Sequence, residues 1–291
     1  MSEPTPSPAT SFGSVADAYD RARPSYPDDA VAWLTGGGRA HVVELGAGTG
    51  KLTEVLHRGG HHVLATEPLL PMLARLGQRV AVPHAAAAAE AIPVRSRSVD
   101  VVACGQSFHW FDAERALPEI ARVLRPGGVI GLVWNTYDTS IPWVRRLKRL
   151  LSPASDRDGE LPTPALLESP YFGFVEEKRF RFWQSHTARS LEELARSVSH
   201  VATMSASARE RTLAEVASLY DGYGRGHDGM QLPWVTRCFR AVVRHQDLPP
   251  EPSHAPVDHD AAPPGLEDQD AARPADRRPP EDPGMQLIDF R

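Results

Sequence analysis

A glycine-rich turn at residues 42–50, VVELGAGTG, constrains the fold more than any other stretch of this chain. The β-branched pair Val42 and Val43 predicts a strand, and an amphipathic segment begins at Lys51. Between them lie three glycines in a G-x-G-x-G spacing: Gly46, Gly48 and Gly50. Glycine lets the backbone pass close to a ligand, but such a turn also occurs as a plain tight connection. Ligand binding therefore needs support from elsewhere in the chain.

Two carboxylates provide that support. Glu44 comes at the end of the first predicted strand, and Glu67 follows a second predicted strand at 61–66. Open α/β sheets bind ligands at the carboxyl ends of their strands. Glu67 also lies about twenty residues beyond the glycine turn, which is the distance at which a carboxylate meets a ribose in nucleotide-binding βαβ units.

The rest of the chain alternates strand and helix patterns. We expect strands at 79–82, 99–105, 129–134, 174–183 and 232–243, and helices at 12–20, 28–34, 51–58, 68–75, 113–124, 142–151, 191–198 and 208–220. We expect a loop at 152–164, and a capping box of Ser190 and Glu193 at the start of the helix at 191–198. This rhythm predicts an α/β fold with a parallel sheet and helices on both of its faces.

Composition narrows the class of protein. The chain has 291 residues, of which 41% are hydrophobic, enough for one large domain or one domain with a small appendage. The net charge of −5 does not favour a nucleic-acid partner. Cys104 and Cys238 form neither a metal-spacing cluster nor a disulfide scaffold. With no apolar run of bilayer length, the sequence predicts a soluble cytoplasmic protein without a membrane partner.

Both ends of the chain differ from its middle. Residues 1–11 are rich in Pro, Ser and Thr, and we expect them to be disordered. From 247 to 291 the chain carries eleven acids and four arginines, a charge of −7 that leaves the remainder near +2. We expect residues 246–291 to form a solvated, disordered tail. The alternative is that its closing residues MQLIDFR dock on the folded part.

Seven motifs in order resemble those of class I S-adenosylmethionine-dependent methyltransferases. Within that family the chain is similar to small-molecule enzymes of methyltransferase type 11, which include the trans-aconitate and juvenile-hormone-acid type. The resemblance runs from about Phe12 to Arg244. It rests on ELGAGTG (44–50), Glu67, AEAIP (89–93), SFHWFD (107–112), ARVLRPGG (121–128), YDRARPSYP (19–27) and NTYDTSIPW (135–143).

The resemblance implies a Rossmann-like sheet of seven strands, mostly parallel, whose last strand is antiparallel. It also implies a methyltransferase domain over 12–245 with a small helical lid or cap, built from about 136–170 and 184–228. S-adenosylmethionine would be the cofactor, and we infer no metal. Monomer and homodimer both stay open.

Site residues follow from the matched motifs. Glu44 would meet the cofactor's ammonium group, Glu67 both ribose hydroxyls, Met72 the adenine face and the Ala89 amide an adenine nitrogen. Further cofactor contacts implied are the three glycines, Ala47, Pro68, Gln106, Tyr19 and Arg23. The chain departs from its relatives at Ala88, which offers no side-chain bond to the adenine amino group.

Acceptor contacts are expected from His109, Trp110, Tyr26 and Asn135. Methyl transfer is an in-line displacement from an already activated sulfonium, so positioning supplies much of the rate. A carboxylate acceptor needs no base, whereas a phenol, alcohol or amine does, and His109 is the best-placed base. The alternative is that His109 only hydrogen-bonds a neighbour and shapes the pocket.

Three functions stay open. The leading one is methyl transfer to a small-molecule carboxylate, hydroxyl or amine in metabolism or natural-product biosynthesis. A second is a catalytically silent S-adenosylmethionine-binding or scaffold protein that works through its acidic tail. The third is an NAD(P)-dependent oxidoreductase, which the glycine spacing and the SFHWFD segment disfavour.

Overall fold

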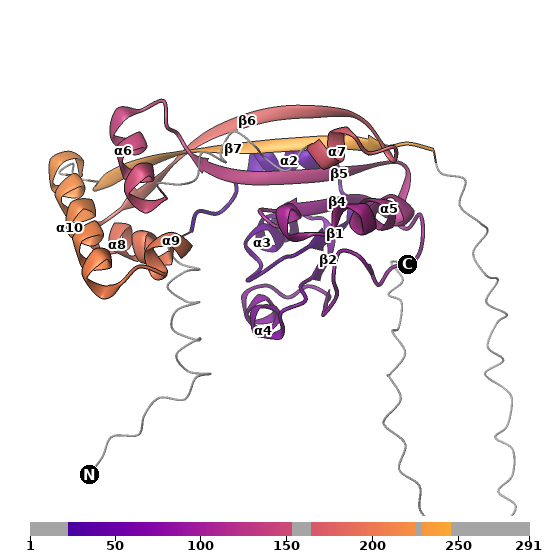
Figure 1. Cartoon of the computed structure of the whole chain (residues 1–291). Helices are drawn as coiled ribbons and strands as arrows, with labels where there is room; N and C mark the ends of the chain where they lie inside the picture. The colour runs from indigo at the N-terminus through magenta and orange to yellow at the C-terminus, as the bar shows by residue number, and fades with distance from the viewer. Residues whose placement is uncertain (1–22, 153–163, 225–227, 246–291) are drawn as a thin grey trace, which may run out of the picture.

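The computed structural model describes residues 23–152, 164–224 and 228–245 (Figure 1). Four expectations lie outside them: the disordered ends, the helix at 12–20, most of the loop at 152–164, and any role of Tyr19.

A single seven-stranded sheet organises the described chain, in the order β3-β2-β1-β4-β5-β7-β6. Neighbouring strands from β3 to β5 pair in parallel, and β7 pairs antiparallel with both β5 and β6. The predicted Rossmann-like sheet with an antiparallel last strand is confirmed. The strands are β1 (His41–Leu45), β2 (His62–Thr66), β3 (His84–Ala85), β4 (Val99–Gly105), β5 (Leu124–Tyr137), β6 (Phe172–His186) and β7 (Met230–Val243).

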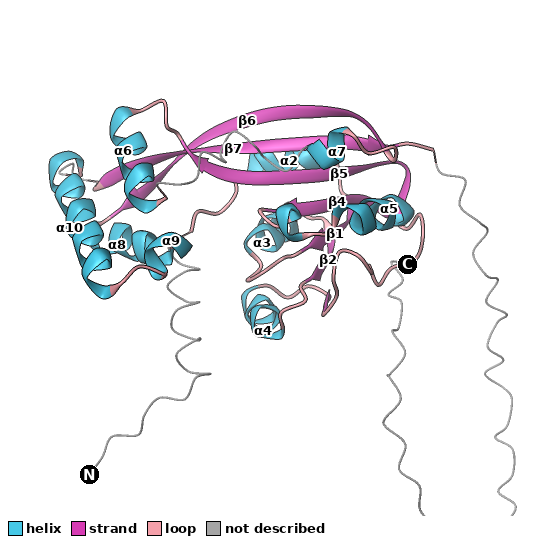
Figure 2. Ribbon diagram, in the orientation of Figure 1, coloured by secondary structure: helices cyan, strands magenta, loops and turns pink. Residues whose placement is uncertain are grey.

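Helices cover both faces of this sheet (Figure 2). Along β1, Val42 belongs to one apolar cluster and Val43 to the other, because successive side chains of a strand point to opposite faces. Residues of α2 (Asp28–Thr35), α3 (Lys51–Arg58) and α4 (Leu70–Arg79) join Val42. Residues of α5 (Ala113–Val123) and α7 (Pro164–Leu167) join Val43.

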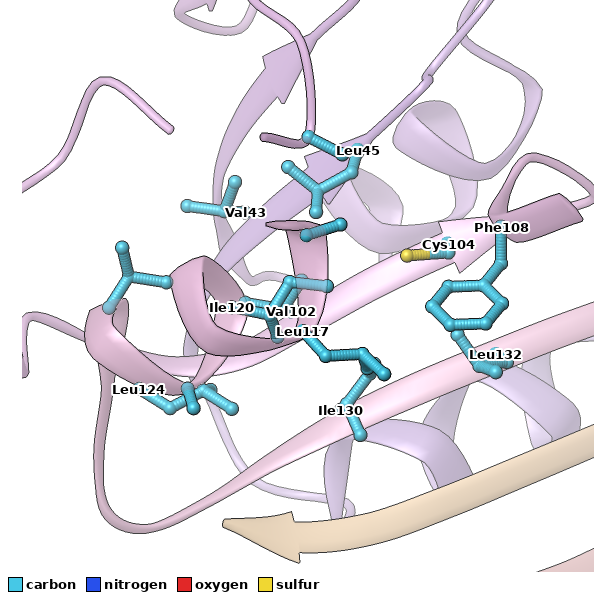
Figure 3. Packing of buried hydrophobic residues seen from close by; sticks show 14 of the residues in the cluster. Val43, Leu45, Val102, Cys104, Phe108, Leu117, Ile120, Leu124, Ile130 and Leu132 are labelled. Atoms are coloured by element: carbon cyan, nitrogen blue, oxygen red, sulfur yellow. The ribbon is translucent and has the colours of Figure 1, made fainter. Parts of the chain in front are cut away.

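Figure 3 shows the cluster on the α5 face. Leu117 and Ile120 of α5 pack onto side chains of β4 and β5, among them Val102 and Ile130, all of them 5% exposed or less. At roughly 1.5–3 kcal/mol for each fully buried aliphatic side chain, this cluster anchors the strand that precedes the predicted SFHWFD segment.

Three elements begin more than two residues from the predicted position: β5, which starts at Leu124 and not at 129, β3 and α8. The third strand was expected at 79–82, but Arg79 ends α4 and the strand is His84–Ala85. Val80 and Val82 are buried in the loop between α4 and β3 and pair with no strand. Their apolar alternation therefore reflects burial in a loop and not a strand. Pro83 separates them from β3, and its carbonyl accepts a hydrogen bond from the Ala65 amide of β2.

Helix α8 (Ala188–Ser197) begins three residues before the expected position. Its capping box is formed by Thr187 and Ser190, because the Thr187 hydroxyl accepts from the Ser190 amide and the Ser190 hydroxyl accepts from the Thr187 amide. The expected partner Glu193 instead pairs with Arg189 one turn away. The prediction of a capping box of Ser190 and Glu193 is therefore wrong.

Strands β5, β6 and β7 have 14 to 15 residues each. They extend beyond β1, β2 and β4, toward the left of Figure 1. A span of about 45 Å follows from the strand rise. Their far ends share a third apolar cluster with α6 (Pro142–Leu151), α8, α9 (Ser199–Ala202) and α10 (Ala206–Tyr223). This cluster includes Leu147 of α6, Leu194 of α8, Val216 of α10 and Trp234 of β7.

Candidate active site

The glycine turn links β1 to α3 in a conformation that side chains oppose. Gly46, Gly48 and Gly50 have φ angles of +65°, +57° and +86°, which is left-handed backbone. A Cβ on Gly46 would lie 2.6 Å from Cβ of Ser107, and one on Gly50 would lie 3.0 Å from Leu76. At Gly48 a Cβ would meet nothing within 4 Å, and this residue lines a cavity. Close packing therefore excludes a side chain at Gly46 and Gly50, whereas at Gly48 only the left-handed backbone favours glycine.

That cavity, of about 630 Å³, lies at the carboxyl ends of β1, β2 and β4. Strand order reverses between β1 and β4, and the crevice there is the usual ligand site of open α/β sheets. Its lining contains twelve residues predicted from the sequence: Arg23, Tyr26, Glu44, Gly46, Ala47, Gly48, Glu67, Pro68, Met72, Ala89, Gln106 and Trp110.

Glu67 is held rigidly at the end of β2. Its Oε2 accepts from the Gly48 amide at 2.9 Å, and its Oε1 accepts from the Leu69 amide at 3.0 Å. Each carboxylate oxygen has a second lone pair, so both oxygens can accept another hydrogen bond from a ligand. The carboxylate is thus fixed to the glycine turn while it faces the cavity.

Glu44 lies deeper, with 1% of its surface exposed. Its Oε2 accepts from the Thr53 hydroxyl of α3 at 2.6 Å. Burial raises the pKa of Glu44 to about 8, the Thr53 hydrogen bond opposes the rise, and the charge of Glu67 adds to it. A cation bound in the cavity would therefore stabilise the ionised form of Glu44 and lower its pKa.

The segment after β4 closes another side. Gln106 has φ +55°, uncommon for a residue with a side chain, and its amide donates to the Val133 carbonyl of β5. Its Nε2 lies 3.5 Å from the Tyr26 hydroxyl. Ser107 donates to the Leu45 carbonyl at 2.7 Å and so ties this segment to the glycine turn. Backbone strain of this kind is retained where the surrounding structure fixes it, often at functional sites.

His109 and Trp110 lie on a short 3-10 helix, η1 (Phe108–Trp110), near the mouth. Trp110 lines the cavity and is 80% exposed, whereas His109 is not among the lining residues. The two rings are 4.7 Å apart. Partial desolvation lowers the pKa of His109, which favours the neutral imidazole that a proton acceptor requires.

Two other predicted site residues do not line the cavity. Gly50 only shapes the turn against α4. Asn135 donates through Nδ2 to the Ser25 carbonyl and accepts at Oδ1 from the Thr236 hydroxyl. Both ends of its side chain are thus used to tie the segment that carries Tyr26 to β5 and β7.

The sequence reasoning missed Lys51 and Leu69, which both line the cavity. Burial lowers the pKa of Lys51. A signal was available for it, since a lysine in the first turn of a helix opposes the helix dipole and calls for another reason to be there. Leu69 is 59% exposed beside the mouth, and an exposed leucine carries no such signal in the sequence.

The described residues contain no group of three or more His, Cys, Asp or Glu side chains arranged to hold a metal ion. Within the same ranges, every helix is too short or too polar to cross a membrane.

Comparison with known proteins decides the family. A family model described as a methyltransferase domain matches residues 43–132. An uncharacterized methyltransferase of Mycobacterium tuberculosis is 41% identical over 238 residues, covering 80% of this chain and 96% of the relative. The chain belongs to the class I S-adenosylmethionine-dependent methyltransferases. An uncharacterized methyltransferase of Schizosaccharomyces pombe is 35% identical and covers 69% of this methyltransferase and 83% of its own length.

Solved structures agree with this methyltransferase in fold. A protein of Anaeromyxobacter dehalogenans, assigned as a type II methyltransferase, has a TM-score of 0.58 at 24% identity. The match covers 76% of this methyltransferase and 97% of that chain. An assigned methyltransferase from an antibiotic biosynthesis pathway of Anabaena variabilis has a TM-score of 0.52 at 20% identity, with coverages of 72% and 95%. The class I fold implies S-adenosylmethionine as the methyl donor.

Proposed function

We propose that this methyltransferase transfers a methyl group from S-adenosylmethionine to a small-molecule carboxylate, hydroxyl or amine in metabolism or natural-product biosynthesis. The observation that carries the proposal is the Glu67 carboxylate, which two backbone amides hold in the cavity beside the glycine turn. A carboxylate fixed in this way suits the paired hydroxyls of a ribose.

The other residues of the cavity fit the remaining parts of that cofactor. The open space at Gly48 leaves room for a ligand against the backbone, and Glu44 offers a negative charge for an ammonium group. Met72 and the buried Ala89 line the cavity and suit an adenine ring. When bound, S-adenosylmethionine supplies an activated methyl group for in-line displacement.

The acceptor would approach from the side of Tyr26, Gln106 and Trp110. The Tyr26 hydroxyl and the Gln106 amide are close enough to orient an acceptor together. Asn135 acts as a positioning residue, because it holds the Ser25 carbonyl next to Tyr26. His109 lies beside Trp110, outside the lining, and would accept the proton of a hydroxyl or amine through a bridging water, whereas a carboxylate acceptor would not need it.

Two observations bear on the choice of acceptor. The cavity volume of about 630 Å³ falls in the range of roughly 300–1,000 Å³ that is typical of small-molecule sites. A malonyl-[acyl-carrier protein] O-methyltransferase of Salmonella typhimurium is 29% identical over 54% of this chain. Carboxylates, free or carrier-bound, are therefore the first acceptors to test.

Calorimetric titration with S-adenosylmethionine and S-adenosylhomocysteine, with NADH as a control, tests the cofactor. We expect micromolar binding of the first two and none of NADH. Absence of binding would refute the proposal, and intact binding with no transfer to any carboxylate, hydroxyl or amine would favour a catalytically silent protein. His109→Ala separates the acceptor classes, since it should abolish transfer to a hydroxyl or amine and spare transfer to a carboxylate.

A further inference from the structure

The start of α5 is completed by a residue from a distant loop. Asp112 is the N-cap of this helix, and its carboxylate accepts from the Glu114 amide. In a capping box the third helical residue also accepts from the N-cap amide, but here that residue is Arg115, which carries no acceptor. The Asp112 amide donates instead to Oε1 of Glu90 at 2.9 Å, a residue that lies 22 positions earlier in the chain. Glu90 therefore takes the part that a capping-box residue usually has.

This hydrogen bond joins two sides of the cofactor cavity. Glu90 belongs to the connection between β3 and β4, whose residues 88–90 line the cavity. Under the proposed function, the adenine ring of the cofactor lies against this connection. On the other side, Trp110 and Phe111 line the same cavity and directly precede Asp112. The acceptor would approach from that side, so one hydrogen bond connects the two halves of the site.

The remainder of the same connection is fixed to α5 by an ion pair. The Glu119 carboxylate accepts from the Ile92 amide at 2.9 Å and from Arg122 at 2.7 Å, and Arg122 also donates to the Ile92 carbonyl at 3.1 Å. The side chains of Arg122 and Glu119 are only 28% and 20% exposed, whereas the bond between Glu90 and Asp112 is exposed to solvent. Hydrogen bonds open to water belong to the parts of a structure that open most readily. The Glu90 end of the connection is therefore the part whose order can depend on a ligand.

We propose that Glu90 is a positioning residue that couples cofactor binding to the order of the acceptor side of the cavity. This inference rests on the proposed function, because the ligand that packs against residues 88–90 is the cofactor. With the cofactor in place, the Glu90 carboxylate has less freedom and holds the Asp112 amide, and with it Trp110, for a larger fraction of the time. The acceptor side is then complete only after the cofactor has bound.

The strength of one hydrogen bond limits the size of this coupling. A hydrogen bond to a charged group changes an equilibrium by a factor of about ten when it is made or lost at such a site. Coupling between two sites is reciprocal, so whatever factor the cofactor adds to the stability of this bond must also appear in the cofactor affinity when the bond is removed. The affinity and the order of the acceptor side should therefore change together.

Hydrogen–deuterium exchange measures this bond directly, because the Asp112 amide is its donor. The test uses the full-length chain with and without saturating S-adenosylhomocysteine and follows the amides of residues 108–112. Glu90→Ala removes the acceptor, whereas Glu90→Gln keeps an oxygen that accepts. Glu114→Ala, which removes an exposed acid from the first turn of α5, is the matched control for the loss of one negative charge. A purely structural role of Glu90 would change the exchange equally with and without the ligand.

We expect the ligand to slow exchange of the Asp112 amide about tenfold in the native chain and in Glu114→Ala, and nearly as much in Glu90→Gln. In Glu90→Ala the slowing should fall below about twofold, and the affinity for S-adenosylhomocysteine should fall by about tenfold at most.

Three results would overturn the proposal: a native Asp112 amide that the ligand leaves unchanged, a slowing that is lost in Glu114→Ala as well, or a slowing that Glu90→Ala retains in full. Retained slowing with a lower affinity would mean that Glu90 only contacts the cofactor. A native chain that does not bind S-adenosylhomocysteine would refute the proposed function itself, and this inference with it, so the two failures are distinguishable.

Discussion

Glu44 and Glu67 end neighbouring strands, yet their surroundings give them different tasks. Two backbone amides hold the Glu67 carboxylate, whereas one hydroxyl contacts Glu44 and the rest of its side chain is buried. The pKa of Glu44 is consequently raised to about 8, so its ionisation responds to pH and to a bound cation.

Replacement of Glu44 should change how stability depends on pH. In the unfolded chain the carboxyl ionises near pH 4.5, and in the folded protein near pH 8. Between these values the folded protein retains a proton that the unfolded chain has lost, so the free energy of unfolding falls as the pH rises, by up to about 1.4 kcal/mol per pH unit. Below about pH 4.5 this effect is absent, and above about pH 8 it is constant.

Thermal unfolding of the native protein and of Glu44→Gln, at about pH 6 and about pH 9, measures this effect. The native protein should lose more stability over that interval than the variant, because the amide does not ionise. Equal losses would show that Glu44 does not titrate in this range. The comparison cancels the contributions of all other groups.

Replacement of Glu67 should act on the cofactor. We expect Glu67→Ala to weaken S-adenosylmethionine binding by more than tenfold, which corresponds to about 1.4 kcal/mol, the scale of one charged hydrogen bond. Glu54→Ala, an exposed acid on α3, is the matched control and should bind normally. An unchanged affinity in Glu67→Ala, measured by calorimetry, would remove this carboxylate from the site.

At the scale of elements, the glycine turn separates folding from binding. Gly46→Ala would force a Cβ to 2.6 Å from Ser107, so it should lower the melting temperature strongly. Gly48→Ala pays only the left-handed backbone cost of about 1–2 kcal/mol, because its Cβ would point into open space. That methyl would occupy the cavity, so Gly48→Ala should lose cofactor affinity while it remains folded.

Melting curves and cofactor titrations of the two variants check this pair. Equal loss of stability in both would mean that backbone conformation alone governs the turn. Full cofactor affinity in Gly48→Ala would mean that the cofactor does not approach the backbone at this glycine.

Elements with a buried or strongly amphipathic pattern could be predicted from the sequence. Residues 99–105 and 142–151 form a strand and a helix with the expected bounds, since the first is a short apolar run of strand length and the second is amphipathic with helical spacing. The failures have local causes. Thr187–Ser190 and Ser190–Glu193 have the same capping spacing, and only the three-dimensional structure selects between them. Strand β3 has two residues, too few to show any period.

The candidate site divides in the same way. Residues on the glycine turn and at strand ends could be predicted, because chain order alone brings the carboxyl ends of parallel strands together. His109 and Asn135 illustrate the limit of that reasoning. Each lies close in sequence to residues at the site, but His109 does not belong to the lining, and the Asn135 side chain is hydrogen-bonded to Ser25 and Thr236.

For the whole molecule, negative charge is concentrated in the last 45 residues of the chain. Residues 247–291 carry a charge of −7, whereas the rest of the chain is near +2. Electrostatic attraction between them would be screened by salt and would add little to the packing energy of the sheet.

Deletion of residues 247–291 should therefore leave the melting temperature within about 3 °C of the native value. Proline and charge dominate this segment, so it has little apolar surface to bury against the domain. An electrostatic contribution below about 1 kcal/mol shifts the melting temperature by less than about 3 °C in a domain of this size. A larger drop at physiological salt would show that the closing residues MQLIDFR pack on the domain, and replacement of Leu287 and Ile288 by serine would then reproduce it.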